Sequence, residues 1–302
     1  MLILQKVINC KGQIMKTTKD MPIIDAVCGL FTHDAQPYRP EWRDKFLVEK
    51  IGAEKDRVSG HSLDELVGKL DDAGIEQAII HAVRAGQEHH PSSVRIPYEL
   101  VHEATKKYPG KLYGVAGIDP TEGMEGVRKF EWAVKDLGFI GAHFYPHWFE
   151  IPPNHAKVYP FYAKCVELNV PIQMQVGQSL LYDTSFPRRS VGQPITLDEV
   201  ACDFPELVLI GIHVGIPWTN EMIAMAWKHP NVYIGSDAHS PKYWPKEFVH
   251  YINTYGKDKV IFGTDFPVLD FARTIKEIEE LDINEIALKK IMYENTQKIY
   301  NL

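Results

Sequence analysis

Short apolar runs alternate with longer amphipathic stretches along most of this 302-residue chain. Eight of the runs are almost continuously apolar, as strands buried on both faces of a parallel sheet require. They lie at 22–27, 76–83, 111–120, 139–146, 170–178, 206–215, 231–238 and 259–267. Each is followed by a stretch with helical periodicity, and the last by two, which begin near Phe271 and Asn284. This order predicts an α/β protein, a single (β/α)8 TIM barrel with an extra C-terminal helix.

The same pattern sets the expected boundaries of the barrel. Residues 1–21 lack it and are expected to form an N-terminal extension outside the fold, whereas 22–302 form the barrel. Within the barrel, Ser62 and Glu65 are spaced as a capping box that begins a helix at 61–74. The segments 32–60 and 178–194 are rich in Pro, Gly, Arg and polar residues, and are expected to be insertions over the mouth of the barrel.

The charge and cysteine content of the chain argue against some classes of binding partner. The net charge is −7 and Lys and Arg form no blocks, which argues against nucleic acid or an anionic membrane as a partner. No apolar run approaches the roughly 20 residues that span a bilayer. None of the four cysteines falls in a C-x-x-C pair, so we expect reduced thiols in a cytoplasmic protein. These features favour an enzyme for a small-molecule substrate.

Polar side chains occur at the carboxyl ends of nearly all the predicted strands, where barrel enzymes place their active sites. They are Asp25, His81, Asp119, His143, His147, Gln175, His213, Asp237, His239 and Asp265. His213 and Asp265 stand apart because each ends an apolar strand beside a glycine, with a proline soon after. His and Asp are the residues of proton transfer and of metal binding. We therefore predict that Asp265 and His213 are catalytic.

Several segments carry a resemblance to a known family. They are GFIGAHFYP at 138–146, HVGIPW at 213–218, KVIFGTDFP at 259–267 and the closing ENTQKIYNL at 294–302. Together they resemble the amidohydrolase-related (amidohydrolase 2) family, which includes the aminocarboxymuconate semialdehyde decarboxylase-like enzymes. The resemblance implies a TIM barrel, a homodimer, and one divalent metal, often zinc.

In that family an H-x-H after the first-strand Asp, a His on strand 5, a His on strand 6 and an Asp on strand 8 hold the metal. Here the H-x-H positions are Val27 and Gly29, and the strand-5 position is Gln175. Only His213 and Asp265 match. Val and Gly offer no donor atom and a Gln amide is a poor zinc ligand, so the resemblance leaves the cofactor open.

The sequence is consistent with three functions. The first, taken as the main prediction, is a hydrolase of a lactone or ester-like carbonyl compound, with Asp265 as general base and His213 polarising the carbonyl, possible without a metal. The alternative is a non-oxidative decarboxylase of a small aromatic or unsaturated acid, in which the same two residues protonate the carbon that loses CO2. A third hypothesis, of another class, is a barrel that only binds a ligand.

Substrate binding is assigned to residues of the predicted mouth. Gln175 is expected to donate or accept a hydrogen bond, His143 and His147 follow the fourth strand, and Arg188 is a candidate for holding an anion. Aromatic residues are plentiful there and predict a pocket for a flat, partly apolar molecule. They are Phe31, Tyr38, Trp42, Tyr145, Trp148, Phe149, Tyr182, Trp218 and Trp244.

Overall fold

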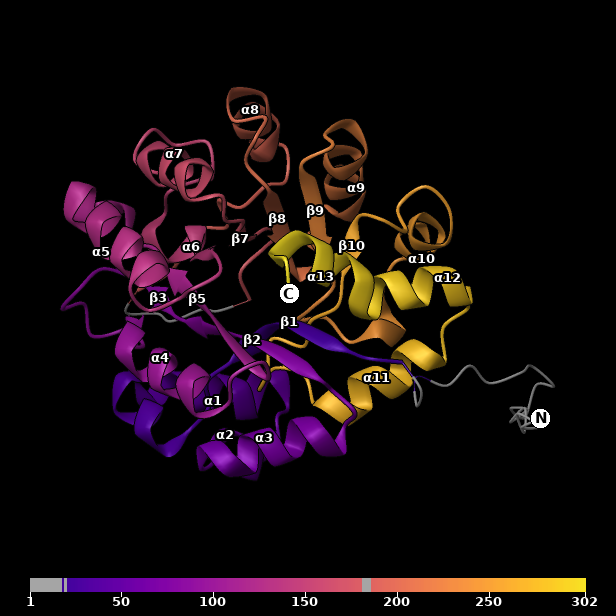
Figure 1. Cartoon of the computed structure of the whole chain (residues 1–302), viewed down its shortest axis with the longest axis horizontal. Coiled ribbons are helices and arrows are strands. Elements are labelled where there is room, and N and C mark those ends of the chain that lie inside the picture. The colour runs from indigo at the N-terminus through magenta and orange to yellow at the C-terminus, as the bar shows by residue number, and fades with distance from the viewer. Residues whose placement is uncertain (1–17, 19–20, 181–185) are drawn as a thin grey trace.

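The computed structural model describes residues 18, 21–180 and 186–302, and shows eight parallel strands inside a ring of helices (Figure 1). The strands, in their order around the sheet, are β1 (Ile24–Gly29), β2 (Gln77–Ala82), β5 (Leu112–Gly117), β6 (Ala142–Phe144), β7 (Ile172–Gln175), β8 (Leu209–Ile212), β9 (Val232–Gly235) and β10 (Val260–Ile261). Their sequence order equals their spatial order, as right-handed βα crossovers produce. The predicted TIM barrel is therefore confirmed.

Backbone hydrogen bonds close the barrel between its first and last strands. Ala26 N donates to Phe262 O (2.9 Å), Asp265 N to Val27 O (2.7 Å) and Gly29 N to Phe266 O (3.0 Å). The closure continues beyond Ile261, the last residue of β10, through residues 262–266. The loop that carries Asp265 is thus paired directly to β1.

The outer ring follows the predicted amphipathic stretches. It consists of α3 (Leu63–Asp72), α4 (Tyr98–Lys107), α5 (Gly123–Lys135), α7 (Tyr159–Leu168), α8 (Thr196–Asp203), α9 (Thr219–Lys228), α10 (Lys246–Asn253), α11 (Phe271–Glu279) and α12 (Glu285–Lys289). The capping box of α3 is present as predicted, since Glu65 N donates to Ser62 Oγ and Ser62 N donates to the Glu65 carboxylate. Among the described residues no helix is long and apolar enough to cross a membrane.

The N-terminal end of the barrel is filled by apolar side chains and plugged by the last helix. Val27, Ile79, Ile210 and Ile261 form part of an inner cluster against which α13 (Asn295–Tyr300) packs. A turn of π-helix at Lys290–Glu294 joins α12 to α13. This packing leaves the opposite end of the barrel, at the carboxyl ends of the strands, for a site.

The insertion 32–60 is more regular than its composition suggested. It contains a 3-10 helix at His33–Tyr38, then α1 (Glu41–Phe46), a π-helical turn at Leu47–Ile51, and α2 (Lys55–Val58). Another short helix, α6 (Pro146–Phe149), follows β6. Of the expected extension 1–21, all but Thr18 and Met21 lie outside the described residues.

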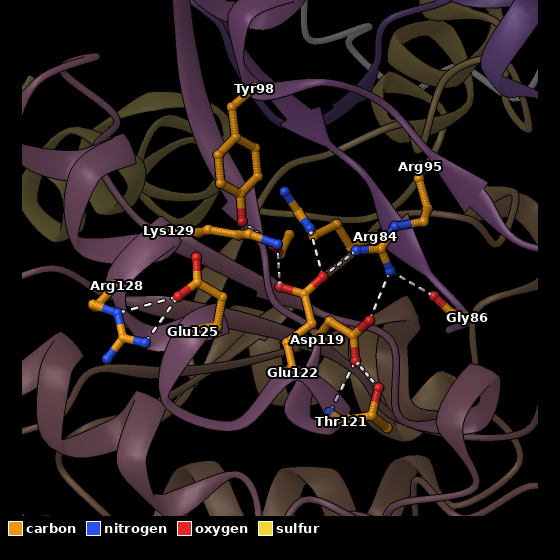
Figure 2. Close-up of polar contacts among 11 residues, drawn as sticks. Arg84, Gly86, Arg95, Tyr98, Asp119, Thr121, Glu122, Glu125, Arg128 and Lys129 are labelled. Atoms are coloured by element: carbon orange, nitrogen blue, oxygen red, sulfur yellow. Dashed lines mark hydrogen bonds and ion pairs between the residues drawn. The ribbon is translucent and has the colours of Figure 1, made fainter. Parts of the chain in front are cut away.

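β3 (Arg84–Ala85) and β4 (Val94–Arg95) form a hairpin. Ion pairs join this hairpin to the residues that follow β5 (Figure 2). Arg95 pairs with Asp119 (Nη1–Oδ2 2.7 Å) and with Glu122, which also accepts from Arg84 (3.0 Å). Asp119 Oδ1 in turn accepts from Thr121 N at 2.9 Å, as the side chain that caps the turn after β5. Asp119 therefore serves the structure of this strand end.

Candidate active site

His213, Asp237 and Asp265 lie together where β8, β9 and β10 end. His213 Nε2 is 3.2 Å from Asp237 Oδ2 and 3.6 Å from Asp265 Oδ2. The other oxygen of Asp237, Oδ1, accepts a hydrogen bond from His213 N at 3.0 Å. The structure thus brings together the two predicted catalytic residues and adds Asp237, whose residue type alone was equally consistent with a turn.

The backbone at two of these residues lies in the left-handed region, with φ of +70° at His213 and +54° at Asp265. Side chains other than glycine adopt this region rarely, and such residues concentrate at functional sites. His213 directly follows β8, whereas Asp265 lies beyond β10 in the segment that pairs with β1, and both residues line the same pocket.

Burial controls the protonation of this cluster. It raises the pKa of Asp237 to about 7, and it raises the pKa of Asp265 well above its ordinary value, with the charge of Asp237 adding to the shift. Burial also lowers the pKa of His213 to about 3. Near neutral pH the His213 imidazole is therefore neutral, and the carboxyl group of Asp265 keeps its proton to higher pH than an exposed aspartate does.

The cluster opens into a pocket of about 730 Å³, counting its open mouth. Tyr145, Trp148 and Phe46 line it with aromatic surface. Polar groups enter from several elements, and they are Arg43, Gln175, Gln178, Ser179, His213, His239 and Asp265. This mixture of aromatic walls and a few polar groups is typical of a site for a small, flat molecule.

Arg43 is the residue that sequence reasoning missed. It comes from α1, within the insertion that was expected to cover the mouth, and its charge opposes the upward shift of the Asp265 pKa. The Nε atom of Arg43 is buried without a hydrogen-bond partner among the described residues. The site therefore has a cationic group close to a carboxyl group whose pKa is raised.

The predicted substrate-binding residues occupy different places. Gln175 lines the pocket. His143 is fully buried beneath it, with its ring 4.2 Å from that of Tyr145, and His147 is buried with Nδ1 accepting from Val191 N at 3.0 Å. Trp218 lines a separate surface groove.

Arg188, the predicted anion holder, does not line the pocket. Its guanidinium group stacks on Trp148, 4.0 Å from the ring centroid, and donates to Ser92 Oγ at 2.7 Å. It therefore supports an aromatic wall from behind. Tyr182, one of the predicted mouth aromatics, lies outside the described residues.

Several buried imidazoles of the barrel have a ring nitrogen without a hydrogen bond to any described residue. The Nε2 atoms of His81, His143, His147 and His213 are buried with no hydrogen-bond partner among the described residues. The rings of His81 and His143 lie 4.0 Å apart, and burial lowers the pKa of His81 to about 3 and of His147 to about 4. Near neutral pH these buried imidazoles are therefore uncharged.

Comparison with known proteins identifies the family of this chain. Residues 37–302 match the model of the amidohydrolase family. The chain belongs to this family. It is 22% identical over 294 residues to the gamma-resorcylate decarboxylase of Polaromonas sp., covering 80% of this chain and 84% of the relative.

Solved structures share the fold. An uncharacterized TIM-barrel protein from Bordetella bronchiseptica superposes with a TM-score of 0.75 at 23% identity, over 92% of this chain and 98% of the other. The 5-carboxyvanillate decarboxylase of Novosphingobium aromaticivorans, solved with manganese and 4-hydroxy-3-methoxy-5-nitrobenzoic acid, gives a TM-score of 0.71 at 17% identity, over 94% and 97%. The main prediction of a hydrolase is wrong on these findings, because the relatives of known activity are decarboxylases and not hydrolases.

The usual metal position of the family does not fit a metal in this chain. Val27 packs in the inner apolar cluster, and a Cβ added at Gly29 would overlap the carbonyl oxygen of Phe266. Gln175 offers an amide where a histidine is usual. The remaining donors are His213, Asp237 and Asp265, whose ligand atoms lie within 4.8 Å of one another.

Proposed function

We propose that this protein is a non-oxidative decarboxylase of a small hydroxylated aromatic acid. The names of its relatives support a carboxy-lyase, and so do the aromatic walls of the pocket. The observation that carries the proposal is that Arg43 and Asp265 line one pocket, because decarboxylation needs an anchor for the carboxylate and a proton for the carbon.

Arg43 would hold the carboxylate that is lost. A guanidinium group binds a carboxylate through two parallel hydrogen bonds, which fixes the plane of the group as well as its position. Tyr145 and Trp148 would hold the ring of the substrate. The bond to be broken is then placed between Arg43 and the carboxyl group of Asp265.

Asp265 would supply the proton. Its carboxyl group gives its proton to the ring carbon that bears the carboxylate, the bond between that carbon and the carboxylate breaks, and its electron pair stays on the ring as CO2 leaves. Asp265 is left ionised and regains its proton from water. One proton is consumed and one CO2 is released, so the step balances without an oxidant or reductant.

The other polar groups would manage the ring hydroxyl. A hydroxyl ortho or para to the carbon stabilises the protonated ring by releasing electrons into it, and it needs a hydrogen-bond acceptor while it does so. Gln175 and the neutral imidazole of His239, whose pKa burial lowers to about 4, both line the pocket and can accept. Asp237 would hold the backbone of His213 by accepting a hydrogen bond from its N–H.

The test is a search for CO2 release from a panel that includes 2,6-dihydroxybenzoate, 5-carboxyvanillate and 2-hydroxybenzoate, with the protein as purified and with added MnCl2. In D2O, deuterium is expected at the ring carbon that lost the carboxylate, as proton NMR shows. Asp265→Asn should abolish release, whereas Asp136→Asn, an exposed aspartate at the end of α5, should not. Binding of these acids with no CO2 from any of them would overturn the proposal.

A further inference from the structure

Asp25 is a buried carboxylate that the proposed reaction does not use. It is the second residue of β1 and has no exposed surface, and burial raises its pKa to about 7. A buried carboxyl group is costly unless hydrogen bonds repay it, so its contacts show what it is for.

The side-chain hydrogen bonds of Asp25 lead to its own strand and to the segment that carries Asp265. Its Oδ1 accepts from Val27 N (3.1 Å) and from Thr264 N (3.0 Å), and its Oδ2 accepts from Thr264 Oγ1 (2.5 Å). The hydroxyl oxygen of Thr264 in turn accepts from Phe266 N at 3.1 Å. The chain Asp25–Thr264–Phe266 therefore spans the residue between Thr264 and Phe266.

That residue is Asp265, which is held in the left-handed region with φ of +54°. Its own N–H donates to Val27 O at 2.7 Å. Three successive backbone amides, at 264, 265 and 266, are thus fixed to β1 directly or through the hydroxyl of Thr264. A conformation that an aspartate rarely adopts needs this kind of constraint from its surroundings to persist.

We propose that Asp25 and Thr264 are positioning residues, which hold Asp265 in its left-handed conformation and so aim its carboxyl group at the pocket. Neither residue lines the pocket, so each acts through Asp265. This inference rests on the proposed function only in its first test, because that test measures the rate of decarboxylation. The hydroxyl of Thr264 is the key atom, because it both donates to Asp25 and accepts from Phe266.

Threonine 264 offers a matched set of variants. Thr264→Val keeps the shape and removes the hydroxyl, whereas Thr264→Ser keeps the hydroxyl. The control is Thr296→Val in α13, since Thr296 is equally buried and its hydroxyl has no partner among the described residues. The valine and serine variants separate the hydroxyl from the methyl group, and the control separates the site from the core.

In the decarboxylase assay, Thr264→Val should lower kcat by about 10²-fold, as misplacement of a reacting group by about 1 Å does, with KM changed much less. Thr264→Ser should restore kcat to within a few-fold, and Thr296→Val should match the wild type. A Thr264→Val protein that loses thermal stability but keeps its kcat would overturn the proposal, because the hydroxyl would then serve folding alone.

A second measurement does not need the substrate. With 13C-labelled aspartate, the backbone Cα and carbonyl chemical shifts of Asp265, assigned by their loss in Asp265→Asn, report its left-handed conformation and are expected to change in Thr264→Val but not in Thr264→Ser. Unchanged backbone shifts in Thr264→Val would overturn the proposal even if no decarboxylase substrate had been found. Failure of the proposed function is thereby distinguished from failure of this one.

Discussion

Replacing Arg43 by glutamine tests the anchor for the substrate carboxylate. The change removes the charge and the guanidinium fork and keeps a shorter polar side chain. Hydrogen bonds to charged groups contribute about 1.5–3 kcal/mol each. At about 1.4 kcal/mol per factor of ten, losing one such interaction lowers kcat/KM by roughly 10- to 150-fold.

The loss should appear mainly in KM, because the carboxylate is bound in the ground state as well as during the reaction. A second effect is specific to this structure. The charge of Arg43 holds the pKa of Asp265 below the value that burial alone would give. Removing that charge raises the pKa, so the alkaline limb of the pH–rate profile should move to higher pH.

The assay is CO2 release measured over pH for the wild type, Arg43→Gln and two controls. Arg189→Gln changes an exposed arginine that pairs with Glu150 (2.9 Å), and Arg188→Gln changes the arginine that stacks on Trp148. We expect Arg189→Gln to match the wild type and Arg188→Gln to lose less than Arg43→Gln. An unchanged KM in Arg43→Gln, together with a large rise in Arg188→Gln, would refute the assignment of Arg43.

Three further predictions concern the same pocket. Because the acid must be protonated, kcat/KM should fall as pH rises through the raised pKa of Asp265. Asp237→Asn removes a charge that raises this pKa and should move that limb to lower pH; a limb that stays in place would contradict the coupling. The usual metal position holds Val27 and Gly29, so plasma mass spectrometry of protein purified without added metal should find well below one equivalent of metal per chain. EDTA should leave the rate unchanged. One equivalent of metal that disappears in Asp265→Asn would show instead that His213, Asp237 and Asp265 bind it. Gln175→Ala should raise KM more than it lowers kcat, and equal losses in kcat and kcat/KM would instead assign Gln175 to the transition state.

The fold was predictable because local patterns and long-range packing agree. Each apolar run became a strand within a few residues of its expected place, and Ser62 and Glu65 formed their capping box. His213 and Asp265 were predictable as a pair because the ends of parallel strands meet at one edge of a barrel. In these cases a residue's position along its own strand decides where its side chain lies.

Arg43 and Arg188 show where that reasoning stops. Both lie in insertions, so their positions along a strand cannot predict where their side chains lie. In the sequence, the two adjacent arginines at 188–189 suggested an anion-binding site more strongly than the single Arg43 did. The structure instead folds α1 over the mouth so that Arg43 enters the pocket, whereas Arg188 is held behind Trp148. Asp237 was undecided for a related reason, since an aspartate after a strand serves equally well as a turn residue or as a partner of a distant histidine.

The lost metal ligands and the raised carboxyl pKa values have one physical explanation. A buried carboxylate is neutralised either by a nearby cation or by a proton. In this chain Asp25, Asp237 and Asp265 lie near one another, and the charge of Asp237 raises the pKa of both Asp25 and Asp265. With Val27 and Gly29 where the family has two histidines, the donors for the usual cation are missing, and burial together with the mutual repulsion of these carboxylates raises their pKa values. A raised pKa keeps the proton on a carboxyl group to higher pH, which is what the acid of the proposed reaction requires.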